Sequence, residues 1–235
     1  MSEATFPNTS WSTVLTARTG GDTGDSQTAL ARLCQQYWYP LYAFARRWGL
    51  ASEDAEDATQ DFFAALSTAD LLAGVDPSRG KLRSFFLTSF QRDLLDFRKT
   101  ANREKRGGGN IISLDLLAAE ERMAAEPSAE PNASFEREWA LEVLDGAIAR
   151  VERNYSETGR AEHFAALRPF LTEEANYDTL CATLSLRLEA ARQAVHRLRA
   201  RLGRALREEI ADTLFEPTEA TVNEELAALR STLAQ

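Results

Sequence analysis

The chain has 235 residues, enough for one large domain or two small ones, and its 44% hydrophobic and 27% charged residues are typical of globular proteins. This composition excludes a chain disordered throughout, a collagen and a coiled-coil rod. No apolar stretch reaches the roughly 18 residues of a membrane-spanning helix, and the first residues lack the features of a secretory signal. Two distant cysteines, Cys34 and Cys181, suit neither a disulfide framework nor a four-ligand zinc site. We therefore expect a cytoplasmic protein.

The charge is distributed unevenly along the chain. The net charge is −9, yet residues 79–106 hold nine Lys and Arg against three acids, and residues 187–207 hold seven Arg against one acid. Two basic segments in an acidic chain are typical of two separate contacts with a polyanion such as DNA. They are equally typical of two solvated helix faces balanced by acidic neighbours, so charge alone leaves both interpretations open.

Residue types and their spacing predict helices in most of the chain, because Ala, Leu, Glu and Arg abound and no stretch alternates as a strand does. In the first half we expect a short helix at 11–17, a helix at 27–48 that Pro40 bends or splits and Gly49 ends, and one or two helices over 81–106. Between them we expect a helix from Ser52 to about Ser67, with its inward positions at Ala55, Ala58, Phe62 and Leu66. Residues 76–80 have the composition of a turn.

The second half begins with a composition typical of a linker. Pro, Ser and acidic residues at high density predict a flexible acidic linker over 109–134, with a short helix after Asp115. Helices are then expected at 135–154, 159–171, 177–184 and 188–210, with a last amphipathic helix through Val222, Leu226, Leu229 and Leu233. The prediction is an all-α fold of two small helical domains, 26–108 and 135–212, with extensions at 1–25 and 213–235.

The strongest local pattern is a short helix at 177–184, a turn at 185–187 and a long basic helix from Leu188. This order is typical of a helix-turn-helix, whose second helix enters the DNA major groove. On a helical wheel the inward arc of the long helix holds Leu188, Ala191, Val195, Leu198, Leu202 and Leu206. The opposite face and its flanks hold Arg192, Gln193, His196 and Arg197, with residue types that pair with adenine and guanine edges. The alternative is an Arg-rich outer face of a helical bundle, although a single acid leaves these arginines little internal pairing.

The segment 81–106 carries two stripes. Leu82, Phe86, Phe90, Leu94 and Phe97 form an apolar stripe, and Thr88, Arg92, Lys99, Arg103 and Arg106 form a separate basic stripe. Basic charge beside an accessible ring such as Phe85 is the combination that binds single-stranded nucleic acid. A core position is the more common role for such a ring.

An acidic stripe of Asp54, Asp57 and Asp61 lies beside Gln60 and Phe63 on the helix that begins at Ser52. It is either a docking surface for a basic partner or an ordinary solvated face, since acids in a first helical turn are stabilised by the helix dipole. A metal-dependent enzyme using these three carboxylates is a third interpretation. Neither His163 nor His196 has metal-ligand spacing to them, so we expect no catalytic residue, metal or cofactor.

In this arrangement the chain resembles the extracytoplasmic-function (ECF) group of bacterial sigma factors. Residues 54–63 (DAEDATQDFF) match the region-two helix that docks on core RNA polymerase, 79–106 (beginning RGKLRSFFL) match the segment that opens and reads the minus-ten element, and 184–201 match the minus-thirty-five reading helix. The runs 37–42 (YWYPLY) and 105–109 (KRGGG) resemble one subgroup of that family. The similarity covers roughly residues 26–210.

The resemblance implies two small domains, region two and region four, and a role for each matching position. It implies polymerase docking by Asp57, Gln60 and Asp61, minus-ten DNA binding by Arg92, Asp96, Lys99 and Arg103, and minus-thirty-five DNA binding by Arg192, Gln193, His196 and Arg197. The implied partners are bacterial core RNA polymerase and promoter DNA, with an anti-sigma factor or a regulatory kinase as the type of regulator, and no membrane.

The chain departs from the family pattern at the turn, where Ser185 replaces a common Gly and Leu188 and Glu189 replace small residues. These departures bear on how tightly the turn closes and on which bases are read. The alternative function is a helix-turn-helix repressor or activator that acts without polymerase. It would be a symmetric dimer, for which the final helix at 221–234 could supply the contact.

Overall fold

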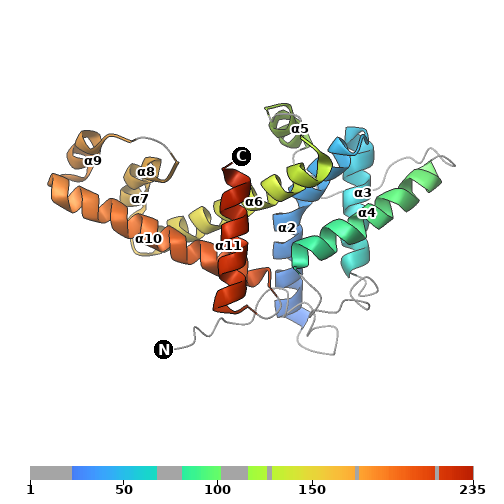
Figure 1. Ribbon diagram of the computed structural model, residues 1–235. Helices are drawn as coiled ribbons and strands as arrows, with labels where there is room; N and C mark the ends of the chain where they lie inside the picture. Colours follow the sequence, from blue (N-terminus) through green and yellow to red (C-terminus); the bar gives the residue numbers. More distant parts are fainter. Residues whose placement is uncertain are drawn as a thin grey trace. The chain divides into compact units, whose positions relative to one another are not determined.

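The computed structural model describes residues 23–67, 81–101, 116–125, 129–172, 175–214 and 217–234, and in these ranges the chain is all-α, with no strand. The helices are α2 (Thr23–Arg47), α3 (Ser52–Ser67), α4 (Leu82–Ala101), α5 (Leu116–Ala125), α6 (Pro131–Glu157), α7 (Ala161–Leu167), α8 (Pro169–Thr172), α9 (Tyr177–Leu184), α10 (Leu188–Asp212) and α11 (Glu219–Leu233) (Figure 1). The all-α prediction is confirmed. The helix predicted at 11–17 and the turn at 76–80 lie outside the described residues. Of the helices in the described ranges, none has the length and apolar character needed to cross a membrane.

The chain divides into two compact units. Unit 1 comprises residues 1–142 and 211–235, and unit 2 comprises residues 143–210. These bounds differ from the predicted domains, 26–108 and 135–212, because the first half of α6 and all of α11 belong to unit 1. The difference arises from contacts between residues far apart in the sequence, which composition does not reveal.

Unit 1 is built around aromatic side chains of α2, α3 and α4. The ring of Phe86 lies 4.6 Å from Tyr37 and 5.7 Å from Phe62, and Phe62 lies 5.4 Å from Phe90. The predicted inward positions of α3 and α4 are buried, apart from Phe97, which is half-buried. Pro40 does not split α2, which continues through it as one helix. Buried residues from Tyr37 to Ala45 hold the helix on both sides of Pro40, and this packing outweighs its local preference.

Two further helices of unit 1, α5 and α11, are held to the rest of the unit by ion pairs and hydrogen bonds. On α5, Glu120 accepts hydrogen bonds from Tyr42 and Arg46, with the Arg46 Nε lying 2.8 Å away, and Arg122 pairs with Glu138 and Glu142. Residues 116–125 are thus held on unit 1, within the span where the sequence predicts a flexible linker. On α11, the buried Glu225 pairs with Arg83 and Lys81 of unit 1.

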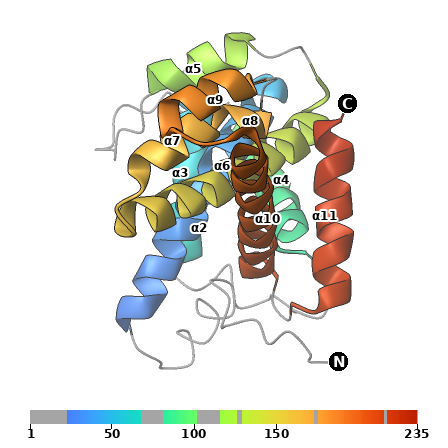
Figure 2. The same cartoon turned by 90° about the vertical axis from the view of Figure 1, so that its left-hand side faces the viewer.

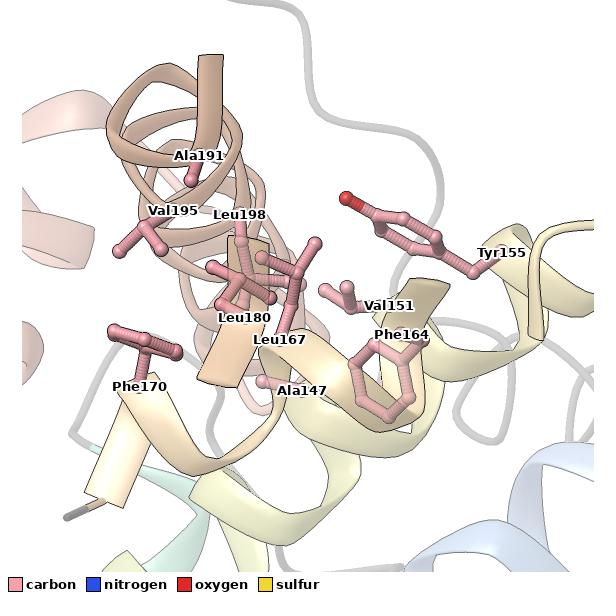
Figure 3. Packing of buried hydrophobic residues seen from close by; sticks show 11 residues of the cluster. Ala147, Val151, Tyr155, Phe164, Leu167, Phe170, Leu180, Ala191, Val195 and Leu198 are labelled. Atoms are coloured by element: carbon pink, nitrogen blue, oxygen red, sulfur yellow. The ribbon is translucent and has the colours of Figure 1, made fainter. Parts of the chain in front are cut away.

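Unit 2 packs α7, α8 and α9 with the second half of α6 and most of α10. Its core joins Val151 and Phe164 to Leu180, Val195 and Leu198 (Figure 3). The helix predicted at 159–171 is divided in two, because Pro169 has no backbone N–H to continue α7 and instead begins α8. Figures 1 and 2 both place α9 next to the first turns of α10.

Candidate nucleic-acid interface

The connection between α9 and α10 is a tight turn. The predicted helix at 177–184 and the predicted start at Leu188 are confirmed. Ser185 ends α9 in the left-handed conformation, with φ 52°, and the Leu186 N–H donates to the carbonyl of Cys181 at 3.0 Å. This conformation normally favours glycine. The turn therefore closes without the glycine that is common in the family that the chain resembles.

The core-facing side of α10 follows the helical wheel except at its first residue. Ala191, Val195 and Leu198 are buried, and Leu202 and Leu206 are half-buried against the same core. The inward prediction is wrong for Leu188, which is 43% exposed. Leu186 of the turn packs against the core just before α10 begins, whereas Leu188 is not among the residues that pack against it.

The outer face of α10 brings together the four side chains that the resemblance assigns to the upstream promoter element. Arg192, Gln193, His196 and Arg197 are all exposed. Arg192 lies 4.0 Å from Glu189, and both side chains are largely in solvent. The other three make no hydrogen bond or ion pair with any residue in the described ranges. This face is therefore available to hydrogen-bond a partner.

Other arginines of α10 serve the fold of unit 2 instead. The guanidinium of Arg199 donates to the carbonyl of Phe170, with Nη2 at 3.0 Å, and that of Arg201 lies over the ring of Tyr155 at 4.8 Å. The sequence shows seven similar arginines over 187–207 and gives no signal that separates these two from the rest. The structure separates them by their contacts with Phe170 and Tyr155.

The basic stripe predicted on 81–106 is described only in part, through Arg92 on α4. Arg92 and Asp96 are exposed, and the pKa of the intervening Asp93 is raised by burial and by the charge of Asp96. Lys99 belongs to α4, but its side chain is not described, and Arg103 lies outside the described residues. Phe85 is half-buried, with its ring 5.9 Å from Phe86. Of the four residues that the resemblance assigns to the minus-ten element, Arg92 and Asp96 therefore lie exposed on α4.

The acidic surface lies on α3. Asp57 and Asp61 are exposed, and the half-buried Gln60 donates from its side chain to Glu56 at 3.2 Å. Partial burial raises the pKa of Asp57, and the charges of Asp61, Asp54 and Glu53 raise it further. Within the described ranges no cation forms an ion pair with Asp57 or Asp61. The acidic stripe is thus a concentration of uncompensated negative charge.

These carboxylates do not form a metal site. No group of three or more His, Cys, Asp or Glu side chains within the described ranges is arranged to hold a metal ion.

Comparison of the chain with protein-family models, with curated proteins and with solved structures finds no match. The functional interpretation therefore depends on three parts of the chain itself: the acidic stripe of α3, the part of α4 that exposes Arg92, and the basic face of α10.

Proposed function

We propose that this protein is a sigma factor of the ECF type, which binds core RNA polymerase and directs it to promoters. The observation that carries the proposal is the exposed face of α10, which holds Arg192, Gln193, His196 and Arg197. Within the described residues the last three have no hydrogen-bond or ion-pair partner, and Arg192 pairs only with the exposed Glu189 at 4.0 Å. Arg and Gln on one helix face suit the hydrogen-bonding edges of guanine and adenine in the major groove. In this proposal α10 reads the duplex of the minus-thirty-five element.

The second DNA contact is assigned to α4 and the residues that follow it. Arg92, Asp96, Lys99 and Arg103 would bind the strand that is opened at the minus-ten element. Flipping a base out of the stack costs a few kcal/mol. Contacts between the backbone phosphates and the basic residues of 79–106 other than Lys81 and Arg83, which pair with Glu225, help to offset that cost. The exposed position of Arg92 on α4 supports this assignment.

Polymerase binding is assigned to the acidic stripe of α3. A basic partner that approaches Asp57 and Asp61 relieves their mutual repulsion, so charge complementarity favours association. The net charge of −9 has a further consequence: the rest of the chain repels DNA phosphates, and the free protein should bind DNA weakly until it joins polymerase. The protein has no catalytic role of its own in this proposal.

The alternative is a dimeric helix-turn-helix repressor. It needs an apolar surface for a symmetric contact, and α11 was the predicted source. In the structure α11 buries Val222 and Leu229 and pairs Glu225 with Arg83, all within unit 1. Because these positions are used inside the chain, the structure gives no specific support to the repressor.

The test is gel filtration of the full chain with bacterial core polymerase, using a charge-reversal variant and a matched control. Asp57→Arg with Asp61→Arg should abolish co-elution, because both substitutions replace attraction by repulsion. Glu152→Arg with Glu157→Arg makes the same change in net charge at exposed positions of α6 and should co-elute normally. Failure of the unaltered chain to co-elute, combined with tight binding to DNA alone, would favour the repressor.

A further inference from the structure

Leu188 is an exposed large apolar side chain on a surface that is otherwise polar. Within the described ranges only two large hydrophobic residues are exposed: Leu95, with an exposed fraction of 50%, and Leu188, with 43%. Leu188 lies in the first turn of α10 and does not pack against the core of unit 2, whereas Leu186 of the preceding turn does. Leu188 is therefore not needed to close the hydrophobic core of unit 2.

The neighbours of Leu188 are the residues proposed to contact DNA. Leu188 and Arg192 are four residues apart on α10, which places their side chains next to each other on one face of the helix. Arg192 has 59% of its side chain exposed and lies 4.0 Å from Glu189, which is 78% exposed. The apolar surface of Leu188 thus borders the base-reading face of α10.

The chemistry of Leu188 limits what it can recognise there. A leucine side chain donates and accepts no hydrogen bond, so it gains nothing from phosphate oxygens or from the polar edges of bases. The apolar group that B-DNA presents in the major groove is the C5-methyl of thymine. Contact with it would remove apolar surface of both partners from water, which is favourable.

We infer that Leu188 contacts the methyl group of a thymine in the upstream promoter element and makes the protein prefer thymine at that position. The inference rests on the proposed function and adds to it a base preference.

Deoxyuridine isolates the proposed contact, because it differs from thymidine only by that methyl group. Polymerase holoenzyme containing the full chain would first select its promoter from a random DNA library. Each thymine of the upstream element would then be replaced by deoxyuridine, one at a time, and the affinity measured. One replacement should weaken binding about fourfold with the unaltered protein, the value of one buried methyl group. With Leu188→Ala the same replacement should have no effect.

Leu95→Ala is the matched control, because it removes a similarly exposed leucine from α4 and should keep the uracil effect at the upstream element. The inference is overturned if the unaltered protein tolerates uracil at every upstream thymine, or if the selected element contains no thymine, and neither result depends on a variant that folds. It is also overturned if Leu188→Ala keeps the uracil effect but weakens polymerase binding, since Leu188 would then contact protein. If the holoenzyme selects no promoter at all, the proposed function itself has failed.

Discussion

The guanidinium of Arg83 on α4 and the carboxylate of Glu225 on α11 form a buried ion pair between residues 142 positions apart in the chain. Arg83 also pairs with Glu136 at 2.9 Å and lies over the ring of Trp139 at 4.3 Å. Three helices, α4, α6 and α11, therefore meet at one buried arginine of unit 1. The guanidinium of Arg83 thus fixes α11 to the other helices of unit 1.

Replacing Glu225 by leucine should strongly destabilise unit 1, because Arg83 would remain buried without its closest carboxylate. Removing one partner of a buried ion pair costs about 3–5 kcal/mol, whereas replacing both partners by apolar residues is often nearly neutral. We therefore expect Arg83→Met with Glu225→Leu to recover most of the free energy of unfolding, measured with urea. As a control, Glu189→Ala at an exposed pair should cost less than about 1 kcal/mol. Equal costs for the Glu225 and Glu189 variants would contradict this.

Ser185→Gly should stabilise unit 2 by about 0.5–1 kcal/mol. Ser185 adopts a left-handed conformation, φ 52°, which costs a residue with a Cβ about 1–2 kcal/mol. Part of that gain is lost because glycine also makes the unfolded chain more flexible. The free energy of unfolding in urea is the appropriate measurement.

Gly159→Ala is the reverse experiment. Gly159 has φ 68°, and a Cβ added there meets nothing within 4 Å. Any loss of stability therefore comes from the backbone conformation and not from a clash, and we expect about 1 kcal/mol. If Ser185→Gly and Gly159→Ala changed stability in the same direction, left-handed strain would not be the cause.

The attachment of α5 to unit 1 should weaken in acid. Hydrogen bonds from Arg46 and Tyr42 hold the pKa of Glu120 below its usual 4.5. A lowered pKa in the folded state means that this stabilisation is complete above about pH 4.5 and is lost as the pH falls through the lower folded value. Glu120→Gln should therefore reduce the acid-dependent loss of unfolding free energy between about pH 5 and pH 3. Glu121→Gln, at the exposed neighbour, should leave that loss unchanged.

Local periodicity predicted the elements well, and it failed where distant residues decide. The apolar spacing of α3 and α4 identified Phe62, Phe86 and Phe90 as core residues, which they are. The same spacing placed Leu188 inward, because a helical wheel contains no information on where the neighbouring core ends. The docking of α5 depends on pairs such as Arg46 with Glu120, 74 positions apart, so composition alone indicated a linker.

The candidate site was predictable to a similar degree. The outward face of α10 follows from sequence, since the four residues assigned to the upstream element are exposed as the wheel indicates. The sequence does not show which arginines of α10 contact the rest of unit 2, because the partners of Arg199 and Arg201 lie on other helices. The burial of Arg83, within a segment that the sequence assigned to DNA, was also hidden, since its partner Glu225 lies in an extension to which no role was assigned.

The different surroundings of Arg197 and Arg199 predict opposite effects of substitution by alanine. Arg197 is exposed and contacts no residue in the described ranges through a hydrogen bond or ion pair. Arg197→Ala should therefore leave the free energy of unfolding within about 0.5 kcal/mol. As one good contact to a base is worth about 1–3 kcal/mol, the same substitution should weaken promoter binding by the holoenzyme about five- to 150-fold.

Arg199→Ala should show the reverse pattern. It removes the hydrogen bonds to the Phe170 carbonyl and should lower the free energy of unfolding by about 1 kcal/mol, while the folded variant keeps most of its promoter affinity. Urea unfolding and binding to fluorescent promoter DNA, measured on both variants at one salt concentration, separate the two roles. If Arg199→Ala weakened DNA binding as much as Arg197→Ala, without loss of stability, Arg199 would belong with the residues of α10 proposed to contact DNA. The base-reading face would then extend toward the Phe170 side of the helix.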